Sequence, residues 1–272
     1  MPNHVTSMIS MKGITKLDLF KKENNHKEFD FNKIIPMPEE LHVESSSEAD
    51  NGLYIYCLCN TFFNGEVEHP TATQILEAFT LMSSSQIKIG ESNAKMAVQK
   101  NSLFFPHFID IERIKSLIDA IKKGEELDRL ISLYEKGKAY YSNVEKYGFA
   151  DWYHWSIANW GTKWNAYETQ ILDGDTIMFD TAWAAPLPII EALSKKYWRV
   201  PIYIKYADED MGSNTGNISF LAGKPLLVIQ PDTRSQEAYA IYVSVKGESD
   251  CLTKDEAGKY YPKDCGECGL CK

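Results

Sequence analysis

Residues 164–183 read WNAYETQILDGDTIMFDTAW, and this stretch decides the fold. Its two halves, residues 164–172 and 176–183, are enriched in apolar and aromatic side chains that alternate with polar ones, as in half-buried strands. The turn between them, Asp173-Gly174-Asp175, is a strong hairpin signal, because glycine and aspartate tolerate the backbone angles of a tight turn. We therefore predict an antiparallel β-hairpin here.

Helical patterns flank this hairpin on both sides. A helical stretch ends at Gly161, a residue that commonly terminates helices. After the hairpin, prolines open a helix over residues 187–197, and residues 200–206 alternate again as a strand. Helix, hairpin, helix and strand form most of a βαββαβ unit, the ferredoxin-like fold.

The first strand of that unit has two candidates in the sequence. One is residues 5–11, in which case the helical middle of the chain is an insertion. The other lies in a second β pair, which we predict at residues 226–230 and 238–246. The predicted class is therefore α+β: a ferredoxin-like antiparallel sheet with a large helical insertion or N-terminal helical region.

This order divides the chain into three expected regions. Residues 1–147 hold an N-terminal strand and a mainly helical region, residues 148–248 the ferredoxin-like domain, and residues 249–272 a cysteine-containing tail. Within the first region, apolar residues recur at helical spacing, and Gly124 and Gly137 are candidate breaks between helices. An exception is Leu53 to Cys59, which we interpret as a strand in which Cys57 and Cys59 are packing residues.

Charge and hydropathy exclude several functional classes. The chain of 272 residues has 38 acidic and 29 basic side chains and a net charge of −9. Broad binding to a phosphate backbone needs a basic surface, so it is not expected. The sequence has no run of about 18 apolar residues, so a membrane span is not predicted. Without a secretory signal pattern at the N-terminus, we expect a cytoplasmic protein with reduced cysteines.

Three pieces of the chain resemble one known family. They are residues 1–5 (MPNHV), residues 31–38 (FNKIIPMP) and, most distinctively, residues 159–166 (NWGTKWNA) with 179–183 (FDTAW). These resemble the YubB-like proteins of plasmids and tailed phages, which have a ferredoxin-like C-terminal domain and no assigned activity. Residues 51–147 and the cysteine tail do not fit that family. The resemblance implies an accessory protein of a mobile element in a bacterial host, and it carries over no catalytic residue.

The tryptophans allow a structural and a functional interpretation. All six lie between Trp152 and Trp198. In the structural interpretation most rings belong to the core and pack across the hairpin. In the functional interpretation exposed rings and nearby polar groups bind a partner or a flat, phosphorylated ligand. The candidate binding residues are Trp160, Lys163, Trp164, Asn165, Asp180 and Trp183.

Strand parity sharpens the structural interpretation. It puts Ile177, Phe179, Thr181 and Trp183 on one face of the second strand and Asp180 on the other. An aspartate in a central strand is costly unless it is paired. We expect its partner to be Lys163, Asn159 or Asn165.

The C-terminal cysteines form a candidate metal site. Zinc takes four tetrahedral sulfur or nitrogen ligands, and Cys-x-x-Cys supplies two of them. An iron–sulfur cluster is an alternative use of the same thiolates, and a reduced tail without metal is a third interpretation. The candidate ligands of a structural zinc ion are Cys251, Cys265, Cys268 and Cys271.

Three functional hypotheses follow, and only the second, in its enzymatic form, needs catalytic residues. The first is a counter-defence inhibitor, a non-enzymatic phage or plasmid protein that occludes a host defence protein. The second is sequestration or enzymatic processing of a small nucleotide at Lys163, Asn165 and Asp180, with His154 as a general base. A hydrogen-bonded structural role for His154 is the alternative. The third is a zinc-stabilised adaptor.

Overall fold

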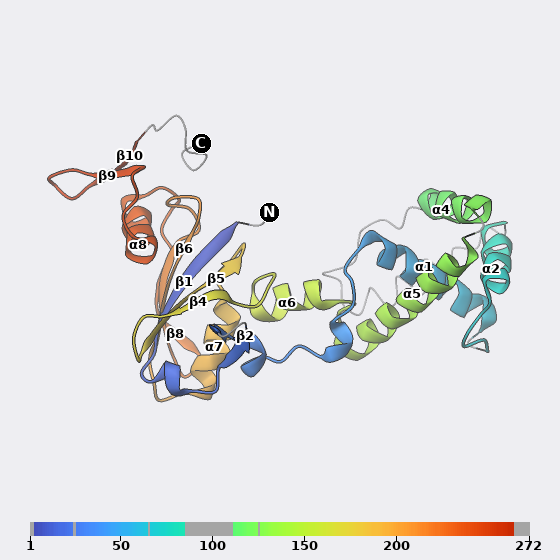
Figure 1. The fold of residues 1–272 in the computed structure, drawn as a ribbon, viewed down its shortest axis with the longest axis horizontal. Coiled ribbons are helices and arrows are strands. Elements are labelled where there is room, and N and C mark those ends of the chain that lie inside the picture. Colours follow the sequence, from blue (N-terminus) through green and yellow to red (C-terminus); the bar gives the residue numbers. More distant parts are fainter. Residues whose placement is uncertain (1–2, 24–25, 65, 85–110, 125, 264–272) are drawn as a thin grey trace. The chain divides into compact units, whose positions relative to one another are not determined.

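The computed structural model describes residues 3–23, 26–64, 66–84, 111–124 and 126–263 (Figure 1). Its contacts divide the chain into two compact units. The sheet unit comprises residues 1–37 and 156–272, and the helical unit comprises residues 38–155. The first 37 residues thus group with the sheet, whereas the sequence pattern had placed them with the helical region.

The sheet unit is built on a 6-stranded sheet in the order β4-β5-β1-β6-β7-β8, with every neighbouring pair antiparallel. Figure 1 shows these strands side by side. Their bounds are β1 His4–Ser10, β4 Tyr167–Ile171, β5 Thr176–Ala182, β6 Ile202–Asp208, β7 Gly216–Leu221 and β8 Lys224–Ile229.

Four of these strands have the ferredoxin-like arrangement. The chain runs β1, α6 (Trp152–Trp160), β4, β5, α7 (Leu187–Lys196), β6, and β1 lies between β5 and β6. The predicted hairpin is confirmed as β4 and β5, and the predicted α+β class is confirmed. Of the two candidates for the first strand, residues 4–10 occupy the position, so the intervening helices are inserted between β1 and α6.

Both faces of the sheet carry buried side chains. On one face, the rings of Phe29 and Phe31 pack against Phe179 of β5, with centroids 5.1 and 6.0 Å from its ring. The ring of Trp160 packs against Phe31 in turn, at 5.7 Å. On the other face, α8 (Gln236–Lys246) packs on β6 around Ala207. These contacts make the sheet the centre of the core.

The predicted strand at residues 238–246 is wrong, because this segment is α8. Its buried residues Ala238, Tyr239, Ile241, Tyr242 and Val245 follow helical spacing. The hydroxyl of Ser235 also accepts the backbone N–H of Ala238 at 3.1 Å, which caps the helix. The strand that pairs with β8 is β7 instead.

Short elements complete the sheet unit. The hairpin of β2 and β3 lies in the N-terminal segment, and the hairpin of β9 and β10 follows α8. Single 3₁₀ turns accompany the first hairpin. The bounds are η1 Ile14–Lys16, β2 Phe20–Glu23, β3 His26–Phe29, η2 Phe31–Lys33, β9 Leu252–Lys254 and β10 Tyr260–Pro262.

The helical unit consists of α-helices after one short 3₁₀ turn. The predicted strand at Leu53 to Cys59 is wrong, because these residues lie inside α1. The segment is short and mostly apolar, so the spacing of its apolar residues does not distinguish a helix from a strand. None of the helices in the described part of the chain is long and apolar enough to cross a membrane. The bounds are η3 Glu39–Leu41, α1 Ser47–Phe63, α2 Ala72–Ser84, α4 Ile111–Gly124 and α5 Leu127–Tyr147.

Helices α1 and α5 touch through their backbones at a pair of glycines. A Cβ atom on Gly137 would lie 2.0 Å from the carbonyl oxygen of Gly52, and one on Gly52 would lie 2.4 Å from the carbonyl oxygen of Leu133. No side chain fits at either position. Gly137 is therefore not a break between helices, as its sequence context indicated, but a contact point in the middle of α5.

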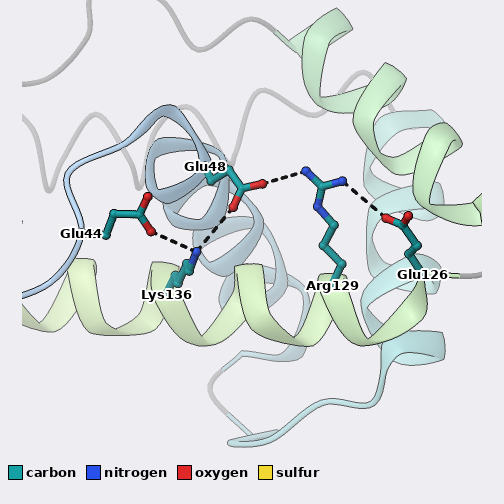
Figure 2. Close-up of polar contacts among 5 residues, drawn as sticks. All are labelled: Glu44, Glu48, Glu126, Arg129 and Lys136. Carbon is teal, nitrogen blue, oxygen red and sulfur yellow. Dashed lines mark hydrogen bonds and ion pairs between the residues drawn. The ribbon is translucent and has the colours of Figure 1, made fainter.

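Charged side chains connect the same two helices at the surface (Figure 2). Lys136 Nζ lies 3.4 Å from a carboxylate oxygen of Glu44 and 3.4 Å from one of Glu48. Arg129 pairs with Glu48 at 2.7 Å and with Glu126 at 3.5 Å. Hydrogen bonds to Arg129 and Lys136 lower the pKa of Glu48.

Candidate functional site

Three of the predicted binding residues form one cluster, which we call the tryptophan clamp: Lys163, Trp164 and Trp183. The ammonium nitrogen of Lys163 lies 4.8 Å from the ring centroid of Trp164 and 4.9 Å from that of Trp183. Both distances suit a cation–π interaction. Trp164 is 37% and Trp183 42% exposed, so both rings also face solvent.

The backbone around Lys163 is set by the end of α6. Gly161 has a left-handed φ of 79°, and a Cβ atom there would lie 2.7 Å from the ring of Pro188. Glycine is therefore needed for both conformation and space. One residue later, the buried hydroxyl of Thr162 donates to the carbonyl of Ala182 at 2.6 Å, which joins this segment to the end of β5.

Trp183 does not follow the strand parity that the sequence indicated. Ile177, Phe179 and Thr181 are buried on the predicted face, but β5 ends at Ala182 and Trp183 has φ 73°. A left-handed backbone is an outlier for so bulky a residue and costs on the order of 1–3 kcal/mol. The change in backbone direction brings the ring out of the core.

Hydrogen bonds at both sides of Trp183 stabilise this conformation. Its N–H donates to the carbonyl of Asn3 at 2.9 Å, and its carbonyl accepts from the side chain of Asn214 at 3.1 Å. The amides of Asn3 and Asn214 also donate to the buried carboxylate of Asp208, at 3.1 and 3.3 Å. The backbone of Trp183 is thus fixed in this conformation, and its ring lies against Lys163.

Asn165 and Trp160 have structural roles instead. The side-chain oxygen of Asn165 accepts the backbone N–H of Phe31 at 2.9 Å, and its amide donates to the carboxylate of Asp30 at 2.8 Å. Trp160 is buried, and its indole N–H donates to the carbonyl of Ile35 at 2.9 Å. Both residues join the N-terminal segment to the sheet, and each bonded pair is separated by 125 or more positions in the sequence.

Asp180 is paired, but not with any of the predicted partners. The hydroxyl of Thr6, directly opposite on β1, donates to its carboxylate at 2.6 Å. Tyr167, opposite on β4, accepts or donates a 2.8 Å hydrogen bond to His4. Burial and the carboxylates of Asp180, Glu209 and Glu168 raise the pKa of Tyr167 to about 12. The prediction that Lys163, Asn159 or Asn165 pairs with Asp180 is wrong, because strand register brings Thr6 there first.

An open groove of about 700 Å³ adjoins the clamp at Trp164. It lies between the β2–β3 hairpin and β4, where Glu168 has φ 53° and a bulge interrupts the pairing with β5. Sequence reasoning missed this groove, because its two walls come from distant parts of the chain. The lining residues are Lys21, His26, Glu28, Trp164, Asn165, Ala166, Tyr167, Glu168, Thr169 and Gln170.

His154 makes a structural hydrogen bond within the helical unit. Its Nδ1 lies 3.0 Å from both carboxylate oxygens of Asp151, which is buried. The same carboxylate accepts the backbone N–H of His154 at 3.0 Å and so caps the start of α6. This geometry fits the structural alternative for His154.

The cysteines of the described residues do not form a metal site. Cys251 is a partly buried free thiol, whereas the other candidate ligands, Cys265, Cys268 and Cys271, lie outside the described residues. Across the described part of the chain no group of at least three His, Cys, Asp or Glu side chains is placed to hold a metal ion. Burial raises the pKa of both Cys57 and Cys59 to about 12, so these thiols are poor nucleophiles.

Fold and site together define an α+β protein with a ferredoxin-like domain and a preformed aromatic surface. Residues 159–245 match the family model of the ferredoxin-like domain in Api92-like protein. The match begins after most of α6 and omits β1, which the structure places in the middle of the sheet.

Apart from this family model, the similarity to known proteins is distant. A crystal structure of protein api92 from Yersinia pseudotuberculosis aligns over 86% of this chain and 100% of that chain, with 11% identity and a TM-score of 0.34. That likeness is too low to support a conclusion on fold or function. No curated protein matches the chain.

Proposed function

We propose that this protein is a non-enzymatic binding protein and that the tryptophan clamp anchors a partner protein. The observation that carries the proposal is the pair of half-exposed rings, Trp164 and Trp183, held on either side of Lys163. Tryptophan is enriched among the residues that dominate binding energy at protein interfaces. A ring that is already ordered loses little conformational freedom on binding, which favours affinity.

The positions of the polar groups support binding over catalysis. Asn165 and Asp180 already make hydrogen bonds that hold the sheet unit together. Lys163 lies against two rings. A general acid or base needs a proton-transfer partner within reach and a carboxylate or imidazole that is available to react. These three residues therefore serve better as a rigid surface than as reacting groups.

We further propose that the partner is a defence protein of a bacterial host and that binding occludes it. This step rests on the resemblance of residues 159–166 and 179–183 to accessory proteins of mobile elements. A net charge of −9 supports a protein partner with a basic surface over a nucleic acid, because complementary charge accelerates association.

The test begins with affinity capture from a host lysate and continues with the purified partner. The variant Trp164→Ala/Trp183→Ala should weaken the measured affinity about 10- to 100-fold, as expected for two residues at the centre of an interface. Trp198→Ala is the matched control, because Trp198 is also exposed and carries a stacked cation, Arg199, at 4.4 Å. Equal affinity of the double variant and the wild type, or a loss only in Trp198→Ala, would place the contact surface elsewhere.

A second candidate function, sequestration or processing of a small nucleotide, is favoured by the groove beside Trp164. A base could stack on that ring, with Lys21 and His26 in the groove wall near the phosphates. Calorimetric titration of ATP and of a cyclic dinucleotide, each followed by chromatography of the ligand, separates binding from turnover. Saturable binding that Lys21→Ala abolishes would support this candidate, and the absence of heat would exclude these two ligands.

The zinc-stabilised adaptor is a separate proposal about Cys251, Cys265, Cys268 and Cys271. Its support is the chemistry of four thiolates, three of them in consecutive Cys-x-x-Cys spacings. Metal analysis of the reduced, unchelated protein should find about one equivalent of zinc or iron. The variant Cys265→Ser/Cys268→Ser should lose that metal, and an equal metal content in both proteins would contradict the assignment.

A further inference from the structure

Strand β8 is an apolar strand at an open edge of the sheet. It is the last strand in the order and pairs with β7. Residues 224–228 are all exposed; Leu226 is 64%, Leu227 49% and Val228 53% exposed. A run of this composition is typical of a strand buried on both faces, so its exposure is unusual.

The other edge of the same sheet is protected. A bulge at Glu168 interrupts β4, and the β2–β3 hairpin lies beside it. There the N–H of Thr169 donates to the carboxylate of Glu28 at 3.0 Å, and the hydroxyl of Thr169 accepts the N–H of Phe29 at 2.9 Å. Bulges and inward charges of this kind block pairing with another chain.

Strand β8 has Lys224 and Pro225 at its start and a bulge at Leu226 in its pairing with β7, but no charge, proline or bulge interrupts Leu227-Val228-Ile229. Its segment Leu226-Leu227-Val228-Ile229 has no charged residue, and in the described residues its backbone ladder is formed with β7 alone. An edge strand with a free row of N–H and C=O groups is a template for another strand. The apolar side chains on both faces add area that pairing would bury.

We propose that a second copy of this chain pairs with β8, antiparallel and about a two-fold axis close to Leu227. The sequence of the edge is self-complementary in charge. The strand begins with Lys224, and Asp232 follows three residues after its end. Antiparallel pairing brings Lys224 of each copy toward residues 230–232 of the other. Within the described residues of one chain, neither Lys224 nor Asp232 makes an ion pair.

The same pairing places the apolar centre of each strand against its copy. With Leu227 opposite Leu227, the bulged Leu226 of one copy lies beside Val228 of the other, and two-fold symmetry repeats the contact. The two sheets then form one continuous sheet across the axis. Because the shared edge is only 6 residues long, the interface is small and the dimer is expected to dissociate at about 10 µM.

Sedimentation velocity of the full chain tests the dimer, at concentrations spanning two orders of magnitude around about 10 µM. The wild type should shift from monomer to dimer mass across this range. Leu227→Lys puts two like charges at the axis and should weaken association at least about 10-fold. Ile171→Lys, the same change on an exposed residue of β4, is the matched control and should not alter it. Circular dichroism verifies that each variant is folded.

A charge exchange tests the register. Lys224→Asp alone should weaken the dimer, and Lys224→Asp/Asp232→Lys should restore it, because the opposite charges meet again with exchanged signs. A wild type that stays monomeric at every concentration would overturn the proposal, even if an extended peptide of another protein bound β8. So would a dimer that Ile171→Lys disrupts and Leu227→Lys leaves unchanged.

Discussion

The sheet unit and the helical unit are held together by different kinds of contact. In the sheet unit, polar side-chain groups bond to backbone groups far away in the sequence, as the amide of Asn165 does at Phe31 and the indole N–H of Trp160 at Ile35. In the helical unit, α1 and α5 approach until their backbones touch at Gly52 and Gly137. Apolar side chains pack around that contact, and ion pairs lie outside it.

The difference predicts which kind of substitution destabilises each unit. A buried hydrogen-bond network is weakened when one partner is removed, because the remaining polar group loses both water and its bond. A backbone contact is weakened when an atom is added, because the helices must separate. Each of the following experiments tests one side of this comparison.

The largest effect is expected from an added methyl group between the helices. Gly137→Ala should destabilise the helical unit by about 3 kcal/mol or more, since the Cβ atom would meet the carbonyl of Gly52. Urea unfolding followed by circular dichroism measures the loss, and hydrogen exchange locates it in α1 and α5. Gly124→Ala, where a Cβ atom would lie 3.4 Å from the nearest side-chain atom, is the control. Equal stability of both variants would mean that the helices do not cross here.

The next largest effect is expected from removing one amide in the sheet unit. Asn165→Ala leaves the carboxylate of Asp30 and the N–H of Phe31 without this partner and should cost about 2 kcal/mol. Faster hydrogen exchange at Phe31 would identify the broken bond. Gln170→Ala, an exposed amide five residues later, should change the free energy of unfolding by less than about 0.5 kcal/mol. If both variants unfold alike, Asn165 does not join the N-terminal segment to the sheet.

A smaller effect is expected from the ion pairs of the helical unit. Arg129→Ala should cost about 0.5 kcal/mol, because both Arg129 and Glu48 are more than 40% exposed. A double-mutant cycle with Glu48→Ala isolates the pair, and its coupling should decrease in 1 M salt, where the screening length is about 3 Å. A coupling above about 2 kcal/mol would show that these charges, and not the glycine contact, hold α1 to α5.

The smallest effect is expected from the pair of Glu40 and Lys146. A 2.7 Å hydrogen bond from Lys146 lowers the pKa of Glu40 from 4.5 to about 2. The charged carboxylate therefore stabilises the folded state above pH 4.5, and this contribution is lost as the pH falls toward 2. The difference in melting temperature between wild type and Glu40→Gln should shrink over that interval. Glu39→Gln is the neighbouring control, and an unchanged difference at low pH would contradict the assignment.

Local patterns predicted the elements whose form depends on neighbouring residues. The Asp173-Gly174-Asp175 turn identified the β4–β5 hairpin, and Gly161 marked the end of α6, because turn and helix-end geometry is set within a few residues. Two apolar segments, Leu53 to Cys59 and residues 238–246, were assigned to strands but form helices. Their residue types suit either state, and only packing partners decide between them.

The site was predicted in part. Lys163, Trp164 and Trp183 do lie together, because the hairpin brings the ends of its two strands close. The roles of Asn165 and Asp180 were not predictable, because their partners Phe31 and Thr6 lie more than 130 positions away in the sequence. The positive φ of Trp183 has no local signature either, since tryptophan does not favour it.

By itself, the sequence determined the class of the fold, the hairpin, most of the helices and the acidic charge. These follow from period, turn residues and composition, which act over short distances along the chain. Tertiary structure alone decided that residues 4–10 complete a sheet otherwise built from residues after 166. It also decided which polar groups are used in folding and which rings stay exposed. Those outcomes depend on pairs of residues far apart in the chain, and such pairs leave no local pattern.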